Sequence, residues 1–559
     1  MPSLHQTLAL FAEIARIRGR HNDASTFARV ADRLASGATV ATVDDESAIV
    51  RDALAAIRDQ GPATALAAAL QDVPQDLRRL VKRGALAHAE AARVVRETGA
   101  ITAGDIIEAL RGDDLGWLET GRRMALLEDA ARVRDERPAT PLGRAWSILE
   151  PLTATIRDAC PEVEQVAATG RSRRYDAFVG AVGLLVSTPD PARTAGRLLG
   201  LAPDLDPLHA GPRTVVFRLE RADVTIRLVT PDAWAHALVW FTGSSAHLER
   251  LKRTAAEHDM VLGRDGLRAA GRLVFARSES DVYAALGLPF IPPEMRETGE
   301  EVDAARAGTL PRPVRLEDVR GDLHMHSDWS DGRDSMDAMV SAAEALGYEY
   351  VAITDHSVSS GIARGLDVAR LDRQRDAVAS LREAHPGITV LHGAEVDILH
   401  DGSLDFPDEV LASLDVVLAS LHDPADHDGA RLTDRYAAAM RHPLVQIITH
   451  PTNRLVPGRE GYPLDERALF EAAVESGTLL EIDGAPGHLD MDGAMARRAV
   501  AAGVEVTIDG DCHRAEWLGR QMLFGVATAR RGWVEAECVA NTRPLEALRA
   551  RLHRKRRAR

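Results

Sequence analysis

Cysteine, aromatic residues and long apolar runs are all scarce in this chain of 559 residues. Its three cysteines, Cys160, Cys512 and Cys538, are odd in number and far apart, so we expect no disulfide framework and a reducing compartment, the cytoplasm. No apolar run reaches the roughly 18–20 residues that span a bilayer, which excludes a membrane partner. Acidic residues outnumber basic ones by 84 to 68, and this excess argues against a general polyanion binder.

The composition changes several times along the chain, and these changes predict its domains. Apolar residues at helical spacing predict a helical domain over residues 1–135. Strand-like and helical segments predict a mixed α/β domain over 140–295, and a charged stretch with prolines predicts a linker over 296–317. Strands and helices alternate over 318–550, and residues 551–559 form a basic tail that we expect to be solvated.

Seven strand-like runs follow residue 318, and helix-like segments separate most of them. Examples of these helices are 335–346, 465–476 and 491–502. Such alternation is typical of a parallel barrel, so the sequence predicts a seven-stranded (β/α)7 barrel at the end of a multidomain protein.

His324 and His326 end the first of these runs. Alternate residues of a strand face the same side, so both imidazoles converge. A single His-x-His pair is weak evidence in a chain with 20 histidines, and a histidine that ends a buried strand is often structural. The interpretation therefore depends on what the other strand ends carry.

Metal-ligating residue types follow six of the seven strand ends, on the rim where parallel barrels build their sites. Imidazole and carboxylate without thiolate suit manganese or zinc, with iron or cobalt as the alternatives. Nine ligands exceed the need of one ion, so we expect two or three divalent ions, an arrangement suited to phosphoester hydrolysis. The predicted ligands are His324, His326, Asp331, His356, Glu395, His422, His450, Asp511 and His513.

The order of these motifs carries a family resemblance. Asp-Leu-His-Met-His-Ser, Ile-Thr-Asp-His-Ser, Ala-Ser-Leu-His, Thr-His-Pro-Thr and Asp-Cys-His resemble the motifs of PHP (polymerase and histidinol phosphatase) domains. Residues 402–405 and 527–533 are similar to the PHP domain of bacterial family X DNA polymerases. The resemblance implies one catalytic ion on His324, His326, Glu395 and Asp511, a second on Glu395, His422 and His450, and a third on Asp331, His356 and His513.

Three further residues near these motifs have less certain roles. The resemblance implies that Arg454 binds a substrate phosphate, and a surface salt bridge is the alternative. Asp509 stands where the family has a serine and is expected to influence metal preference. Cys512 is expected to be a small apolar filler, with a thiolate ligand as the alternative.

The resemblance extends backwards into a polymerase module. Gly-Arg-Ser-Arg-Arg-Tyr at 170–175 resembles the family's Gly-Ser-x-Arg-Arg-Gly, but Ala181, Gly183 and Thr225 stand where three catalytic aspartates are expected. The helical domain also lacks the Gly-x-Gly turns of DNA-binding helix-hairpin-helix motifs, with one glycine in the related stretch 80–86. We therefore expect a retained polymerase fold without nucleotidyl transfer. Phosphate binding is expected to persist at Arg173, Arg174, Gly243 and Ser244.

Together these features predict a metal-dependent phosphoesterase that acts on DNA ends, as a 3′→5′ exonuclease or 3′-end processing enzyme in DNA repair. It is expected in the cytoplasm or at the nucleoid, with DNA ends and repair proteins as partners and no prediction of oligomeric state. Three alternatives remain open. They are a small-molecule phosphatase of the histidinol-phosphatase type, a DNA-end-binding scaffold, and an active family X DNA polymerase.

Overall fold

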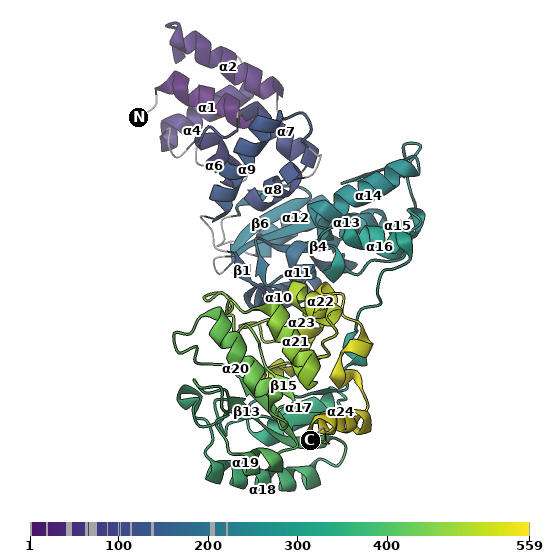
Figure 1. Cartoon of the computed structure of the whole chain (residues 1–559). Coiled ribbons are helices and arrows are strands. Elements are labelled where there is room, and N and C mark those ends of the chain that lie inside the picture. The colour runs from purple at the N-terminus through teal and green to yellow at the C-terminus, as the bar shows by residue number, and fades with distance from the viewer. Residues whose placement is uncertain are drawn as a thin grey trace. The chain divides into compact units, whose positions relative to one another are not determined.

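A computed structural model describes residues 3–17, 21–40, 47–61, 65, 75–86, 88–98, 100, 102–111, 115–135, 139–201, 207–219 and 222–557. The chain divides into two compact units (Figure 1). The first comprises Met1–Arg173 and Phe178–Gly308, and the second comprises Arg174–Ala177 and Thr309–Arg559. Among the described residues, no helix has both the length and the apolar character needed to cross a membrane.

The first unit begins with helices alone, which confirms the predicted helical part. Two apolar clusters hold it together, one centred on Leu8, Val30 and Leu54, the other on Leu80 and Ile106. The glycine of the 80–86 stretch, Gly84, has φ +73° in the turn that separates two of these helices. The helices are α1 (Leu4–Ile17), α2 (His21–Ala35), α4 (Ala48–Gln60), α6 (Gln75–Lys82), α7 (His88–Thr98), α8 (Ala103–Arg111) and α9 (Thr120–Asp135). Residues 136–138, where this part was expected to end, lie outside the described residues.

A five-stranded mixed sheet follows, in the order β2-β4-β7-β6-β5. Its central pair is parallel and aligns Gly183 of β4 with Thr225 of β7. The strands are β2 (Gln165–Thr169), β4 (Val182–Ser187), β5 (His209–Ala210), β6 (Thr214–Leu219) and β7 (Ala222–Val229). The helices of this region are α10 (Leu142–Ala159), α12 (Pro191–Leu201), α13 (Trp234–Thr242), α14 (Ser245–Glu257), α15 (Glu279–Ala285) and α16 (Glu300–Ala307). A small antiparallel sheet of β8 (Met260–Gly263), β9 (Gly266–Ala269) and β10 (Arg272–Leu273) completes the predicted α/β middle.

The predicted linker at 296–317 begins as part of the folded first unit. Arg296 is fully buried, and its guanidinium donates to Glu279 Oε1 at 2.6 Å and to the carbonyl of Ile291 at 2.9 Å. Glu301 lies 2.7 Å from the ring of His247, and both side chains are buried. Two of the charged residues that predict a linker thus form buried ion pairs, and the two units divide after Gly308.

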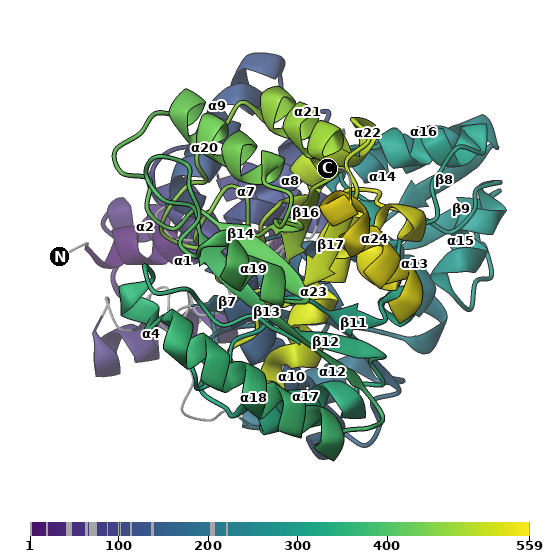
Figure 2. The ribbon, with the colours of Figure 1, turned by 60° about the horizontal axis from the view of Figure 1, so that its bottom comes forward.

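The second unit contains the predicted seven-stranded parallel sheet, in the order β11-β12-β13-β14-β15-β16-β17 (Figure 2). A parallel bridge between Met325 and Cys512, just past the two edge strands, brings those edges together into a nearly closed barrel. The strand runs predicted from the sequence are confirmed. They are β11 (Gly321–Asp322), β12 (Tyr350–Ile353), β13 (Thr389–Asp397), β14 (Val416–Ser420), β15 (Ile447–Ile448), β16 (Leu479–Asp483) and β17 (Val506–Asp509).

The helices of the barrel begin at side chains that cap them. The side chains of Ser335, Asp367, Asp428, Asp465 and Asp492 each accept a hydrogen bond from the amide three residues on. Those at Ser335, Asp465 and Asp492 start the three helices that the sequence predicts. The helices are α17 (Met336–Ala345), α18 (Val368–Ala384), α19 (Asp408–Ser413), α20 (Gly429–Arg441), α21 (Glu466–Ser476), α22 (Gly493–Ala501), α23 (Leu518–Arg531) and α24 (Leu545–Arg557).

The basic tail predicted at 551–559 is, as far as residue 557, the end of helix α24 rather than a solvated segment; residues 558–559 lie outside the described part. Leu552 is 3% exposed and belongs to an apolar cluster with residues of the barrel strands, such as Leu418 and Ile447. Lys555 is also buried, where its ammonium donates to the carbonyl of Val445 and, at 2.6 Å, to Thr478 Oγ1. Buried and exposed positions therefore alternate along one packed helix, which cannot be recognised from the basic composition of the segment.

We therefore expect Leu552→Ala to lower the free energy of unfolding of the barrel by about 2–5 kcal/mol, because it opens a cavity in the core. The matched control is Arg554→Ala, two residues on at an exposed position of the same helix. It should change that free energy by less than about 0.5 kcal/mol. Urea unfolding of both variants tests this, and equal effects would contradict the packed position of α24.

Candidate metal centre

The strand ends bring all nine predicted ligands to one side of the barrel. They line or adjoin an open pocket of about 970 Å³, in which Asp331, His422 and His513 are the most exposed of the nine. His450 and Asp511 have backbone φ values of 24° and 46°, in a region that residues other than glycine rarely occupy. Such local strain is typical of functional sites, where the surrounding fold holds a residue in place.

Glu395, on β13, lies at the centre of this group and is fully buried. Its Oε2 lies 2.8 Å from His356 Nδ1 and 3.6 Å from His324 Nε2. Its Oε1 lies 2.9 Å from His450 Nε2 and 3.6 Å from His422 Nε2. Burial alone would raise the pKa of Glu395, but the surrounding imidazoles hold that pKa well below its usual range. The two oxygens face different histidines, as a carboxylate that bridges two ions would.

His324, His326 and Asp511 form a second close group. The Nε2 atoms of the two histidines are 3.1 Å apart, and Asp511 Oδ1 lies 3.0 Å from His326 Nε2. Two nitrogens bound at right angles, each about 2.1 Å from one ion, would be about 3.0 Å apart. Burial and the neighbouring histidines lower the pKa of His326 to about 3, so its ring is neutral and offers a lone pair.

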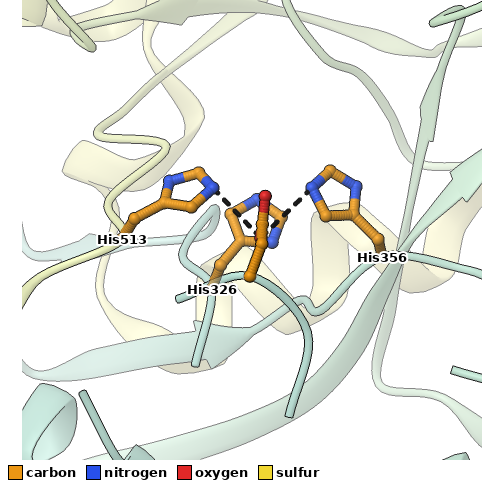
Figure 3. Close-up of side chains that lie close together, drawn as sticks. His326, His356 and His513 are labelled. Carbon is orange, nitrogen blue, oxygen red and sulfur yellow. Dashed lines mark ion pairs between the residues drawn. The ribbon is translucent and has the colours of Figure 1, made fainter. Parts of the chain in front are cut away.

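His326, His356 and His513 lie together in the outermost group (Figure 3), to which Asp331 also belongs. Asp331 Oδ1 is 3.2 Å from His513 Nε2 and 3.6 Å from His356 Nε2. The ring of His326 stacks on both of these histidines, with centroids 4.2 and 4.4 Å away. The four side chains converge closely enough to hold one ion.

Two carboxylates that sequence reasoning missed orient the histidines from behind. Glu481 Oε1 lies 2.7 Å from His324 Nδ1, and Asp397 Oδ1 lies 2.8 Å from His422 Nδ1. With the proton held at Nδ1, the Nε2 of each ring faces the site, as is usual for metal-bound histidines. Asp397 was detectable, because it follows Glu395 by two residues on the same strand and so points to the same face.

Several donor atoms are buried without a hydrogen-bond partner among the described residues. They include Glu395 Oε2 and His356 Nδ1, which lie 2.8 Å apart and yet have no hydrogen bond of suitable geometry. Unpaired buried polar atoms are costly and rare, so this concentration points to ions that satisfy them. The donor set of imidazoles and carboxylates fits divalent transition metals, as expected for a PHP domain.

Asp509 and Cys512 lie beside this group. Asp509 Oδ1 accepts from the amide of Leu323 at 2.8 Å, and burial raises its pKa well above the usual range. Cys512 is buried, its Sγ contacts the carbonyl of Arg514 at 3.0 Å, and burial raises its pKa. Neither residue belongs to a group of converging ligands among the described residues.

The structure gives Arg454 a local partner. Its guanidinium donates to the carbonyls of His488, at 2.9 Å, and Leu489, and it lies 3.7 Å from Asp492. It therefore supports the loop that follows β16, and contact with a substrate phosphate stays a prediction.

The three positions at which the family resemblance places catalytic aspartates line one cavity of about 190 Å³ in the first unit. Ala181, Gly183 and Thr225 lie there with Gly170 and Gly243. These separate segments therefore meet in one cavity. Three cationic residues also line the cavity, together with two acids that pair with two of them: Arg227 lies 3.3 Å from Asp105, Lys252 lies 3.0 Å from Glu249, and Arg171 is the third.

The remaining predicted phosphate contacts have structural partners. Arg173 forms a bidentate ion pair with Glu279, at 2.9 and 2.6 Å, and donates to Thr242 Oγ1. Arg174 is buried, in the short segment that groups with the second unit. Ser244 caps α14 and donates to the carbonyl of Glu297 at 2.6 Å. Neither arginine lines the cavity, so their predicted phosphate contacts remain untested.

Comparisons with known proteins match both units. The family profile "PHP domain" matches residues 322–454, and "DNA polymerase beta thumb" matches residues 237–297. A DNA polymerase/3′-5′ exonuclease PolX of Bacillus subtilis (strain 168) is 32% identical over 505 residues, covering 89% of this chain and 88% of the relative. A probable phosphatase of Citrobacter koseri is 32% identical over 211 residues, 35% of this chain and 80% of the relative. Another, of Thermoanaerobacter sp. (strain X514), is 34% identical over 151 residues, 25% of this chain and 59% of the relative. The chain therefore belongs to the PolX family, in which a family X DNA polymerase module precedes a PHP domain.

Proposed function

We propose that the second unit is a metal-dependent phosphodiesterase that removes nucleotides from the 3′ ends of DNA. One observation carries the proposal: Glu395 is buried between five imidazoles, with its two oxygens directed at different ones. This arrangement supports two or three clustered ions, and clustered ions suit hydrolysis of a phosphoester. The similarity to a protein named polymerase/3′-5′ exonuclease supports a DNA end as the substrate.

In such a site, some side chains would bind the ions and others would orient these ligands. When bound, the ions would activate a water and neutralise charge on the attacking and leaving oxygens. His324 and His326 with Asp511 form one ligand set, and Glu395 joins it to a set with His422 and His450. Glu481 and Asp397 hold the Nδ1 protons of His324 and His422 and so fix their orientation.

The mouth of the pocket favours a polymer over a small enclosed substrate. The pocket is open and is bordered by the loop of residues 359–363. The side chain of Ile362 in this loop is fully exposed, and an exposed apolar group beside the ligands could contact a nucleobase. His422 and Asp331 keep about a third of their side-chain surface exposed, so a phosphate can reach the ligand cluster.

The decisive experiment uses the full-length protein with Mn²⁺ and a single-stranded oligonucleotide labelled at either end. The proposal expects stepwise loss of the 3′ label before the 5′ label, and no reaction in excess chelator. Loss of the 5′ label first, or hydrolysis that persists in chelator, would overturn it.

Salt dependence separates a DNA enzyme from a small-molecule phosphatase, which the similarity to probable phosphatases keeps as the second candidate. Between 50 and 200 mM salt we expect oligonucleotide hydrolysis under subsaturating conditions to fall by about tenfold or more, since each phosphate contact releases counterions. Hydrolysis of p-nitrophenyl phosphate should change by less than about twofold. Equal salt responses, with the small ester as the better substrate, would favour the phosphatase.

A further inference from the structure

We propose that Asp483, His488 and Asp511 hold an additional divalent cation at the edge of the metal centre. The three offer ligand atoms that all lie within 4.8 Å of one another. The inference rests on the proposed function through Asp511, which would be shared with the set that contains His324 and His326. Asp483 ends β16, the one strand of the barrel from which no ligand was predicted. With Asp483 included, all seven strands contribute to the site.

Asp483 provides the strongest evidence for this cation site. It is fully buried at the end of β16, and its Oδ1 accepts from the amide of Ala485 at 2.6 Å. Its Oδ2 is buried and has no hydrogen-bond partner among the described residues. The parallel pairing of β16 with β17 sets Asp483 opposite Asp509, two residues before Asp511. The fold therefore brings a carboxylate with one unpaired oxygen within 4.8 Å of a ligand atom of Asp511.

His488 supplies a nitrogen from the loop that follows β16. Its ring stacks on His450, with centroids 5.0 Å apart and planes at 20°, which fixes its orientation. Two hydrogen bonds fix its main chain. Its amide donates to the carbonyl of Ala485, and its carbonyl accepts from Arg454. Its Nδ1 is buried without a hydrogen-bond partner in the described part of the chain.

The surroundings favour a cation over a purely structural role. Two carboxylates that face each other in a buried site repel, and the fold needs a positive charge or a shared proton to offset this. The nearest arginine, Arg454, directs its guanidinium to the carbonyls of His488 and Leu489 instead. Two carboxylates and an imidazole suit manganese, zinc or iron, with water or a substrate oxygen completing the coordination.

The position beside Asp511 gives such an ion a defined use. It would lie on the side of the pocket lined by His450 and His488, where a phosphate or leaving group bound across the first set can approach it. The class of ligand is thus a divalent cation that also contacts an anionic oxygen of the substrate.

The test counts ions in full-length protein that has been stripped, reloaded with Mn²⁺ and dialysed. Asp483→Asn and His488→Gln should each hold one equivalent less than the wild type. The asparagine side chain keeps an oxygen that can accept from the Ala485 amide, so the fold is expected to survive, and circular dichroism checks this for both variants. The matched control is His400→Gln, at an exposed histidine of the same pocket that pairs with Asp423 at 2.8 Å. It should hold as many ions as the wild type.

Anomalous diffraction at the manganese edge locates the ions independently of activity. A peak between Asp483, His488 and Asp511 supports the inference, as does its loss in His488→Gln. Unchanged ion counts in both variants, with no peak there, would overturn it and would identify a proton shared between Asp483 and Asp511. This failure is distinct from that of the proposed function, which would show as a wild type that binds ions but does not hydrolyse DNA ends.

Discussion

Glu395→Gln is expected to reduce hydrolysis of DNA ends by at least about a thousandfold. The change keeps the shape of the side chain but removes the charge that faces His356, His450 and His422. A bridging carboxylate holds two ions at once, and losing about 4 kcal/mol of transition-state stabilisation corresponds to about a thousandfold in rate. Initial rates on a 3′-labelled oligonucleotide in Mn²⁺ measure the effect.

The accompanying metal content separates this cause from general damage. Glu395→Gln should hold fewer ions than the wild type, with an unchanged circular dichroism spectrum. His400→Gln in the same pocket should retain hydrolysis within about twofold, because its partner is the exposed Asp423. Hydrolysis by Glu395→Gln within tenfold of the wild type would show that the centre does not depend on this carboxylate.

The barrel and the meeting of nine candidate ligands on one side of it were predictable because parallel strands present their ends on one rim. The strands of the second unit are buried, and a His, Asp or Glu stands within three residues of each strand end, so the pattern stands out against a fully apolar run. Helix starts were equally readable, since Ser335, Asp465 and Asp492 cap α17, α21 and α22 by local hydrogen bonds.

Features that depend on distant partners could not be predicted in the same way. Glu481 contacts His324 across 157 positions of the chain, and nothing local marks it as an orienting group. The sequence places Arg296 in a linker and Lys555 in a solvated tail, because charged residues are usually exposed. Both are buried, Arg296 against Glu279, 17 positions earlier, and Lys555 against Thr478, 77 positions earlier. His488 gave no signal because it stands in a loop, where orientation depends on Arg454 and His450.

The polymerase module is expected to incorporate no nucleotide on gapped DNA, in Mg²⁺ or in Mn²⁺. Nucleotidyl transfer needs carboxylates that bind two ions, and Ala181, Gly183 and Thr225 offer none at the aligned positions of the cavity. The assay uses the Glu395→Gln background, so that the PHP domain cannot degrade a product. A family X polymerase with intact aspartates is the positive control. Template-dependent extension by this variant would contradict the alignment of these three positions.

Because of the packing around Gly183, we expect that aspartates introduced at these three positions alone do not produce polymerase activity. A Cβ at Gly183 would lie 2.5 Å from Oγ1 of Thr169 on β2, closer than side chains pack, and 3.4 Å from the Thr169 carbonyl oxygen. The triple change Ala181→Asp, Gly183→Asp and Thr225→Asp should therefore leave the module inactive and less stable by about 1–3 kcal/mol. Adding Thr169→Ala removes the clashing oxygen and should recover part of that stability, as measured by thermal unfolding. Equal stability with and without Thr169→Ala would mean that β2 moves freely aside, and the cavity could then accept a carboxylate at position 183.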